Sequence, residues 1–145
     1  MATMGAGLMS ERVESAPVIE AGLFTIDPPA LLGGRCLMCG AVRFPHRRIC
    51  AVCQAAKVER VPLSTTGTIY TFTVVRTRPP GYLGDVPYAF GFVDLPEGLR
   101  VIATILADDL DAIAVGDTVD FELLALGTGS DAVLAYGFRR RAVTR

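Results

Sequence analysis

The chain has 145 residues, of which 51% are hydrophobic and 20% charged, with a formal net charge of −1. A chain of this size buries roughly two-thirds of the surface that its unfolded form exposes, which disfavours collagen-like, disordered and disulfide-scaffold classes. No apolar run approaches the ~20 residues that cross a bilayer, and residues 1–10 lack the pattern of a secretion signal, so we expect a cytoplasmic protein. The mean hydropathy of +0.43 is high for such a protein and indicates that a partner covers part of its apolar surface.

Charge is unevenly distributed along the chain. Residues 1–34 carry −3 and residues 35–60 carry +5, whereas residues 61–138 carry −7 and the tail from residue 139 carries +4. A basic segment and a basic tail therefore flank an acidic main body.

The first predicted element is an N-terminal arm over residues 1–30. Its Ala, Gly and Met content, with Pro17, Pro28 and Pro29 as breaks, is typical of a flexible start. We expect a short helix within this arm, around residues 18–24.

All four cysteines fall in the next segment, residues 31–60. Two Cys-x-x-Cys turns are separated by ten residues, and two such turns can point four sulfurs at one tetrahedral metal ion. Thiol redox chemistry would need one pair beside a strand-helix-strand pattern, which this segment lacks. The predicted metal ligands are Cys36, Cys39, Cys50 and Cys53.

Zinc is favoured over iron at this site because the ligands are all cysteine and no other redox centre is evident, although iron fits the same geometry. Four thiolates leave no open position for water, so we predict a structural metal. Gly40 can adopt the left-handed conformation after the first turn, whereas Gln54 replaces glycine after the second, which predicts a less regular second turn. His46 is the single histidine and is interpreted as a bystander.

Residues 61–145 are predicted to form a β domain with a basic tail. Strands are expected at 66–78, 88–95, 99–107, 118–126 and 132–139, with a turn at 96–98 and a short helical turn within 108–117. Five strands with one helical element after the third predict a Greek-key barrel of the OB type, and another five-stranded barrel stays open. The fold class is therefore mainly β, with an N-terminal helical arm, a zinc ribbon and a five-stranded barrel.

Several short motifs together resemble the DUF35 family. They are the two cysteine turns with Phe44-Pro45 and Arg47, the strand Gly67–Val74, Pro87-Tyr88, Leu95–Gly98 and Gly116–Val119. The resemblance implies an N-terminal helix, a rubredoxin-like zinc ribbon and an OB-fold. It also implies an accessory role beside thiolases, hydroxymethylglutaryl-CoA synthases or retro-aldolases, including enzymes that degrade steroid or aromatic-derived acyl-CoA, with the catalytic residues on the partner.

The residue inventory argues against independent catalysis. The thiols are predicted to hold metal, and no nucleophile–base pair can be assembled from what remains. The acids Asp108, Asp109 and Asp111 are interpreted as solvated caps near a turn. We therefore predict no catalytic residue in this chain.

A nucleic-acid-binding zinc-ribbon and OB-fold protein is the alternative function. The aromatic residues of the strands could stack bases, although we interpret them as core, and the −7 charge of residues 61–138 would repel phosphate. We prefer an accessory subunit that shares CoA or acyl-CoA with a thiolase-like partner in a hetero-oligomer. Its predicted CoA or partner contacts are Arg47, Arg48, Tyr82, Leu83, Arg139 and Arg140.

Overall fold

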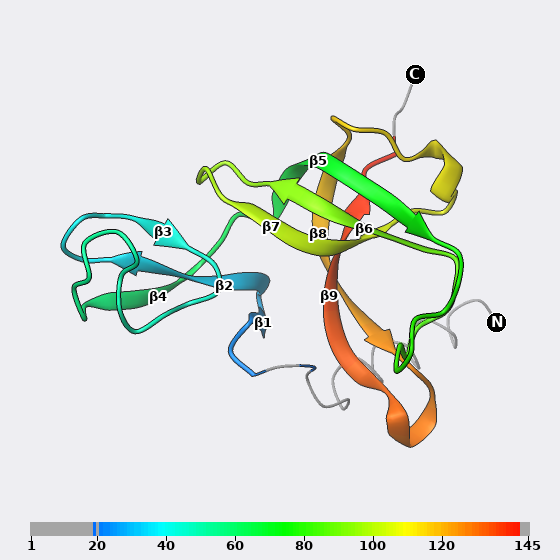
Figure 1. Ribbon diagram of the computed structural model, residues 1–145, viewed down its shortest axis with the longest axis horizontal. Coiled ribbons are helices and arrows are strands. Elements are labelled where there is room, and N and C mark those ends of the chain that lie inside the picture. Colours follow the sequence, from blue (N-terminus) through cyan, green and yellow to red (C-terminus); the bar gives the residue numbers. More distant parts are fainter. Residues whose placement is uncertain (1–18, 20, 143–145) are drawn as a thin grey trace.

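The computed structural model describes residues 19 and 21–142, which form a small ribbon module joined to a closed barrel (Figure 1). The ribbon contains β1(Phe24–Ile26), β2(Pro29–Cys36), β3(Val42–Arg43) and β4(Val58–Pro62). All its pairings are antiparallel, and β2 contacts each of the other three strands.

The barrel contains β5(Thr66–Val75), β6(Tyr88–Asp94), β7(Arg100–Leu106), β8(Thr118–Leu126) and β9(Val133–Arg140). They close in the order β5-β6-β7-β9-β8, with β7 and β9 parallel and all other neighbours antiparallel. A 3-10 turn at Leu110–Ala112 follows β7, and another at Gly129–Asp131 joins β8 to β9. The predicted five-stranded barrel with a helical turn after its third strand is confirmed.

The predicted N-terminal helix is not supported. Of residues 18–24, the structure describes 19 and 21–24, which form bends and turns before Phe24 begins β1. The remainder of the predicted arm, up to residue 18 and at residue 20, lies outside the described residues. Phe24 instead pairs with Leu31 in a hairpin, because its buried ring contributes to the core. No helix among the described residues is long and apolar enough to cross a membrane.

Ribbon and barrel share one apolar core. Phe24 and Leu31 of the ribbon belong to the same buried cluster as Ile69, Val119 and Phe138 of the barrel. Ring contacts complete the junction, since Tyr136 of β9 lies edge-on to Phe24 at 6.0 Å and to Phe44 at 6.3 Å between ring centroids. The ribbon is therefore packed on the barrel, not merely tethered to it.

Three aromatic side chains of β6 lie on the outside of the barrel, which corrects their interpretation as core. Ala89, Gly91 and Val93 are buried, so the alternate residues Tyr88, Phe90 and Phe92 point outward, and Phe92 is 41% exposed. Gly91 faces inward because β5 passes so close that an added Cβ would lie 2.0 Å from the carbonyl oxygen of Thr71. An aromatic row therefore runs along the outer face.

Candidate metal centre and partner-binding face

The two cysteine turns have matching backbone geometry. In the first, the N–H of Cys36 donates to Ala41 O and that of Gly40 to Cys36 O, each at 2.9 Å. In the second, Cys50 donates to Ala55 O and Gln54 to Cys50 O, also at 2.9 Å. Gln54 adopts a left-handed φ of 63°, close to the 78° of Gly40. The prediction of a less regular second turn was wrong, because Gln54 adopts the glycine-like conformation and its N–H closes the turn onto the carbonyl oxygen of Cys50, as Gly40 does onto Cys36.

The turns bring all four sulfurs to within 4.8 Å of one another. The Sγ atoms of Cys36 and Cys53 are 3.5 Å apart, and those of Cys39 and Cys50 are 3.6 Å apart. A disulfide would need about 2.05 Å, whereas four thiolates about 2.3 Å from one zinc ion would lie about 3.8 Å from each other. The sulfurs therefore fit a tetrahedral Zn²⁺ site, as predicted.

The electrostatic surroundings of the four sulfurs also suit a divalent cation. The backbone N–H groups of Cys53 and Val52 point at the sulfur of Cys50 and lower the pKa of that thiol to about 6. The N–H of Ala55 lowers the pKa of Cys53 too, but the Cys36 sulfur and burial outweigh it and raise that pKa to about 12. Since thiolates repel one another, full ionisation of the set requires the positive charge of the metal.

Basic side chains surround this centre. Arg35 pairs with Glu59 at 3.9 Å, while Arg43, Arg47, Arg48 and Lys57 have no ion pair with any described residue. A 220 Å³ cavity beside Cys36 and Cys50 is lined in part by Arg43 and Arg47. His46 lies apart from the sulfur set, with its Nε2 3.1 Å from the carbonyl oxygen of Val58. The predicted residues Arg47 and Arg48 are thus exposed on the ribbon.

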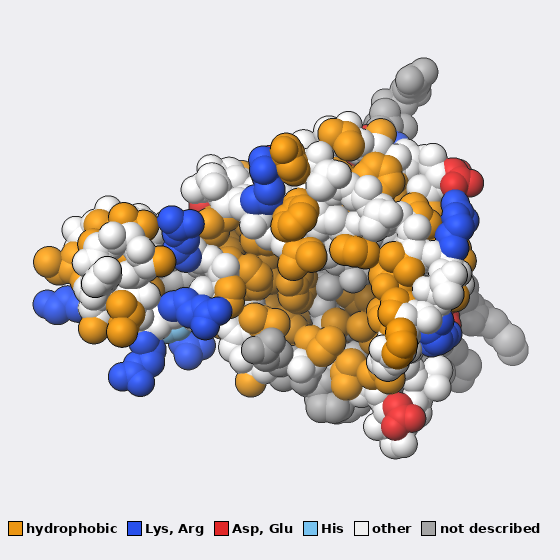
Figure 2. All heavy atoms as spheres, viewed as in Figure 1, with side chains coloured by type: hydrophobic (Ala, Val, Ile, Leu, Met, Phe, Trp, Pro, Cys, Tyr) orange, Lys and Arg blue, Asp and Glu red, His pale blue; other side chains and the backbone are white. Residues whose placement is uncertain are grey.

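An open apolar groove of about 450 Å³ lies on the outer face of the barrel, beside the ribbon (Figure 2). It runs between β6, β7 and the start of β9, and the loop after β5 forms one wall. None of its lining residues is charged. They are Ile19, Gly81, Tyr82, Leu83, Tyr88, Phe90, Ile102, Ala103, Thr104, Leu126, Ala135 and Tyr136.

The loop wall is held by aromatic stacking. Tyr82 stacks on Tyr88 with ring centroids 4.2 Å apart, and Arg78 donates to the carbonyl oxygen of Tyr82 at 3.1 Å. Gly84 lies so close to the Tyr82 ring that an added Cβ would be 2.6 Å from the hydroxyl oxygen. Burial, followed by the charges of neighbouring groups, raises the pKa of Tyr82. The predicted residues Tyr82 and Leu83 therefore belong to the groove.

The predicted contacts Arg139 and Arg140 have partners within the chain. Arg139 lies 2.5 Å from Glu122 and 3.6 Å from Asp108, and Arg140 lies 2.7 Å from Asp117. Arg141 pairs with Asp120 at 2.7 Å. Acids of the barrel thus pair with Arg139, Arg140 and Arg141 and link the end of β9 to neighbouring segments.

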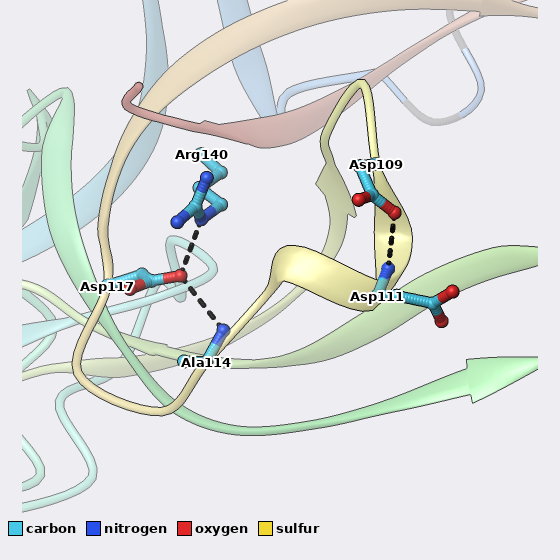
Figure 3. A network of polar contacts seen from close by, with 5 residues as sticks. All are labelled: Asp109, Asp111, Ala114, Asp117 and Arg140. Carbon is cyan, nitrogen blue, oxygen red and sulfur yellow. Dashed lines mark hydrogen bonds and ion pairs between the residues drawn. The ribbon is translucent and has the colours of Figure 1, made fainter. Parts of the chain in front are cut away.

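Of the three acids interpreted as caps, Asp109 caps the turn after β7, whereas Asp108 lies near Arg139 and Asp111 near Arg76. The Asp109 carboxylate accepts the N–H of Asp111 at 3.0 Å, and Asp117 lies between Ala114 N and Arg140 (Figure 3). Asp111 lies 3.7 Å from Arg76. Each carboxylate therefore has a structural partner, and no acid–base pair forms among them.

Sequence reasoning missed the groove residues Phe90, Ile102 and Tyr136. A signal was present, because small residues alternate with aromatic ones along β6, and a strand that packs closely on its neighbour places the small residues inward. Ile102 and Tyr136 come together only through the pairing of β7 with β9, which no local pattern predicts.

Family models match both parts of the chain. Residues 26–59 match the rubredoxin-like zinc ribbon domain of ChsH2, and residues 60–123 match its C-terminal OB-fold domain. A DUF35 domain-containing scaffold protein of Methanothermobacter thermautotrophicus is 36% identical over 79% of this chain and 87% of its own length. The chain belongs to the DUF35 family.

Other relatives are named as enzyme subunits. Benzoylsuccinyl-CoA thiolase subunit BbsA of Geobacter metallireducens is 34% identical over 79% of this chain and 77% of its own length. The same subunit of Thauera aromatica is 33% identical over 77% of each chain.

Among solved structures, a chain of the Ltp2-ChsH2(DUF35) aldolase is similar with a TM-score of 0.65 and 25% identity. The match covers 77% of this DUF35 chain and 84% of the solved chain. A DUF35 protein of unknown function from Sulfolobus solfataricus has the same fold, with a TM-score of 0.52 and 17% identity over 96% of this chain and 98% of its own.

Proposed function

We propose that this protein is a non-catalytic accessory subunit of a cytoplasmic thiolase-superfamily enzyme that acts on acyl-CoA. The observation that carries the proposal is the uncharged groove of about 450 Å³ on the outside of the barrel, together with the contacts within the chain that hold Asp109, Asp111 and Asp117. An exposed apolar surface of this kind is typical of a protein contact. Relatives named as a thiolase subunit and as part of an aldolase support the enzyme class.

The structural zinc supports this role without taking part in chemistry. Four thiolates would complete a tetrahedral coordination sphere, so Cys36, Cys39, Cys50 and Cys53 would fix the ribbon and leave no site for substrate. What the chain contributes is therefore shape and charge beside the partner's active site.

Contact with the CoA thioester is part of the proposal. The phosphates of CoA would meet Arg47 and Arg48, which have no described ion pair, and not Arg139 and Arg140, which are already paired. Tyr82 and Leu83 would contact the partner or border the acyl group, since both line the groove.

The alternative, a nucleic-acid-binding protein, has one supporting observation, the exposed aromatic row along β6. Binding of single-stranded nucleic acid also needs Lys or Arg side chains beside the face on which the bases stack. None lines the groove, and Arg100 near the row is paired with Asp94 at 2.7 Å while its guanidinium lies over the Tyr70 ring. We therefore favour the protein-binding function.

An affinity-tagged chain, purified from the source cells without crosslinking, tests the proposal. We expect a thiolase-like chain at fixed stoichiometry, identified by mass spectrometry. We also expect R47A/R48A to raise the Michaelis constant of that complex for acyl-CoA several-fold, while the matched variant R139A leaves it within two-fold. Recovery of the chain alone, or with nucleic acid, would contradict the proposal.

A further inference from the structure

Four large apolar side chains are exposed around the zinc centre, and none of them lines the apolar groove. Leu37 and Met38 lie between the first two cysteines, Val52 lies between the second two, and Ile49 precedes Cys50. Their exposed fractions are 60%, 66%, 57% and 59% for Leu37, Met38, Val52 and Ile49. We call these residues the knuckle patch. β2 points away from the barrel at this end, so no barrel strand covers the patch (Figure 1).

The backbone beneath the knuckle patch is fixed. The N–H groups of Met38 and Val52 each donate to a cysteine sulfur at 3.4 Å, and the N–H of Leu37 donates to Lys57 O at 2.8 Å. These hydrogen bonds hold the backbone of the patch in place beside the metal ligands. A pre-ordered apolar surface loses little entropy when a partner binds it, which favours recognition by a folded surface.

Positive charge surrounds the knuckle patch. Arg43, Arg47, Arg48 and Lys57 come from the same module, and Glu59 is the single acid between residues 35 and 60, where it pairs with Arg35. Figure 2 shows basic side chains beside apolar ones on the ribbon. An apolar centre with a charged rim is the usual anatomy of a protein interface. The complementary surface would have an apolar centre and a rim of carboxylates.

Two other kinds of partner fit less well. Nucleic-acid binding would need exposed stacking rings, but the ribbon's aromatic residues Phe24 and Phe44 pack on Tyr136, and His46 contacts Val58 O. A membrane-surface site usually contains Trp or Tyr beside its aliphatic residues, and the knuckle patch contains neither.

We infer that the knuckle patch is a docking surface for the partner enzyme, and that it binds an apolar site on that enzyme rimmed by Asp and Glu. This inference rests on the proposed function, because it specifies where the thiolase-like chain is bound. Leu37 and Met38 are the anchors, and the basic rim sets the orientation and the salt dependence of binding.

Affinity measurements with the co-purified thiolase-like chain, in the absence of CoA, test the inference. L37S/M38S and I49S/V52S should each raise the Kd about ten-fold or more, since buried apolar anchors dominate such contacts. V115S is the matched control, because Val115 is 65% exposed on the barrel, and it should leave the Kd within two-fold. Unchanged zinc content in all variants shows that the ribbon is folded.

The charged rim gives a second readout. Wild-type affinity should fall between 50 and 300 mM NaCl. R43E/K57E, which leaves the proposed CoA contacts Arg47 and Arg48 in place, should bind more weakly at low salt and lose part of that dependence. If both serine pairs bind the enzyme as tightly as wild type, the inference is wrong while the proposed function stands. If wild type binds no thiolase-like chain, the proposed function itself fails.

A vesicle-binding experiment distinguishes protein docking from membrane binding by the knuckle patch. Wild type should not sediment with phosphatidylcholine–phosphatidylserine vesicles. Sedimentation that L37S/M38S abolishes, with no effect of those substitutions on the enzyme Kd, would overturn the inference in favour of a lipid surface.

Discussion

At the scale of single residues, Cys39 shows that the cysteines are present to bind metal. Cys39 is exposed, yet its Sγ lies 3.6 Å from that of Cys50, so its role is ligation and not packing. Cys39→Ser should therefore remove the metal and loosen residues 36–60, as metal content and amide exchange would show. Ala51→Ser, an exposed change between two ligands, is the control and should retain zinc. Full zinc content in Cys39→Ser would contradict the assignment.

Gln54 occupies a position where glycine would be less strained. A left-handed φ costs an ordinary L-residue roughly 1 kcal/mol, so Gln54→Gly should stabilise the zinc-bound protein by about 0.5–1 kcal/mol. Denaturant unfolding of the zinc-bound chain measures this change. Gln54→Ala keeps the left-handed cost and should not stabilise, so equal gains from both substitutions would refute the explanation.

Asp117 links the loop after β7 to the tail. Burial tends to raise the pKa of this carboxyl, but hydrogen bonds from Arg140 and the Ala114 N–H outweigh burial and hold the pKa below its usual value. Because the folded state favours the charged form, the stabilisation is complete above an unfolded pKa of about 3.9 and is lost as pH falls through the folded pKa.

Asp117→Asn should lower the free energy of unfolding by about 1–2 kcal/mol at pH 7, since Arg140 and Asp117 are only 21% and 16% exposed. The deficit should shrink as pH falls from 5 to 2.5. Urea unfolding across this range measures it. Asp131→Asn, at a carboxyl with no described ion pair, is the control, and a deficit for Asp117→Asn that is independent of pH would contradict the linkage.

At the scale of elements, Tyr136 of β9 is where ribbon and barrel meet. Its hydroxyl donates to Ile102 O at 3.0 Å across the β7–β9 gap, and its ring contacts Phe24, Phe44 and Phe121. Tyr136→Ala should lower the free energy of unfolding of the protein by about 3 kcal/mol or more and expose backbone amides of β1 and β2 to solvent exchange. Tyr136→Phe keeps the ring and should cost about 1 kcal/mol. Hydrogen exchange and denaturant unfolding together distinguish a local from a global effect of the substitution. Unaltered amide exchange in β1 and β2 of Tyr136→Ala would contradict the role of Tyr136 in joining ribbon and barrel.

Strands, turns and metal ligands could be predicted from sequence because their signals are local. Alternation located β5 to β9, the Pro96–Gly98 turn separated β6 from β7, and cysteine spacing placed the zinc site. The direction in which Phe90 and Phe92 point could not be predicted from the sequence. Alternation divides the side chains of a strand between two faces but does not say which face is buried. The close approach of β5 at Gly91 decides it, and that approach is a tertiary contact.

At the scale of the whole molecule, the charge segregation of the sequence takes on a structural meaning. Three arginines of the tail, Arg139, Arg140 and Arg141, pair with acids of the barrel, whereas most basic residues of the ribbon have no ion pair with a described residue. The high mean hydropathy corresponds to the groove and the knuckle patch, both apolar surfaces outside the core. Such a molecule is suited to cover another protein rather than to turn over a substrate by itself.

One measurement tests that claim most directly: acyl-CoA turnover by this chain alone, by its co-purified thiolase-like chain alone, and by the two recombined. We expect no turnover by this chain, weak or unstable turnover by the partner, and full activity at a fixed ratio of the two. Turnover by this chain alone, or full and stable activity of the partner without it, would contradict the account.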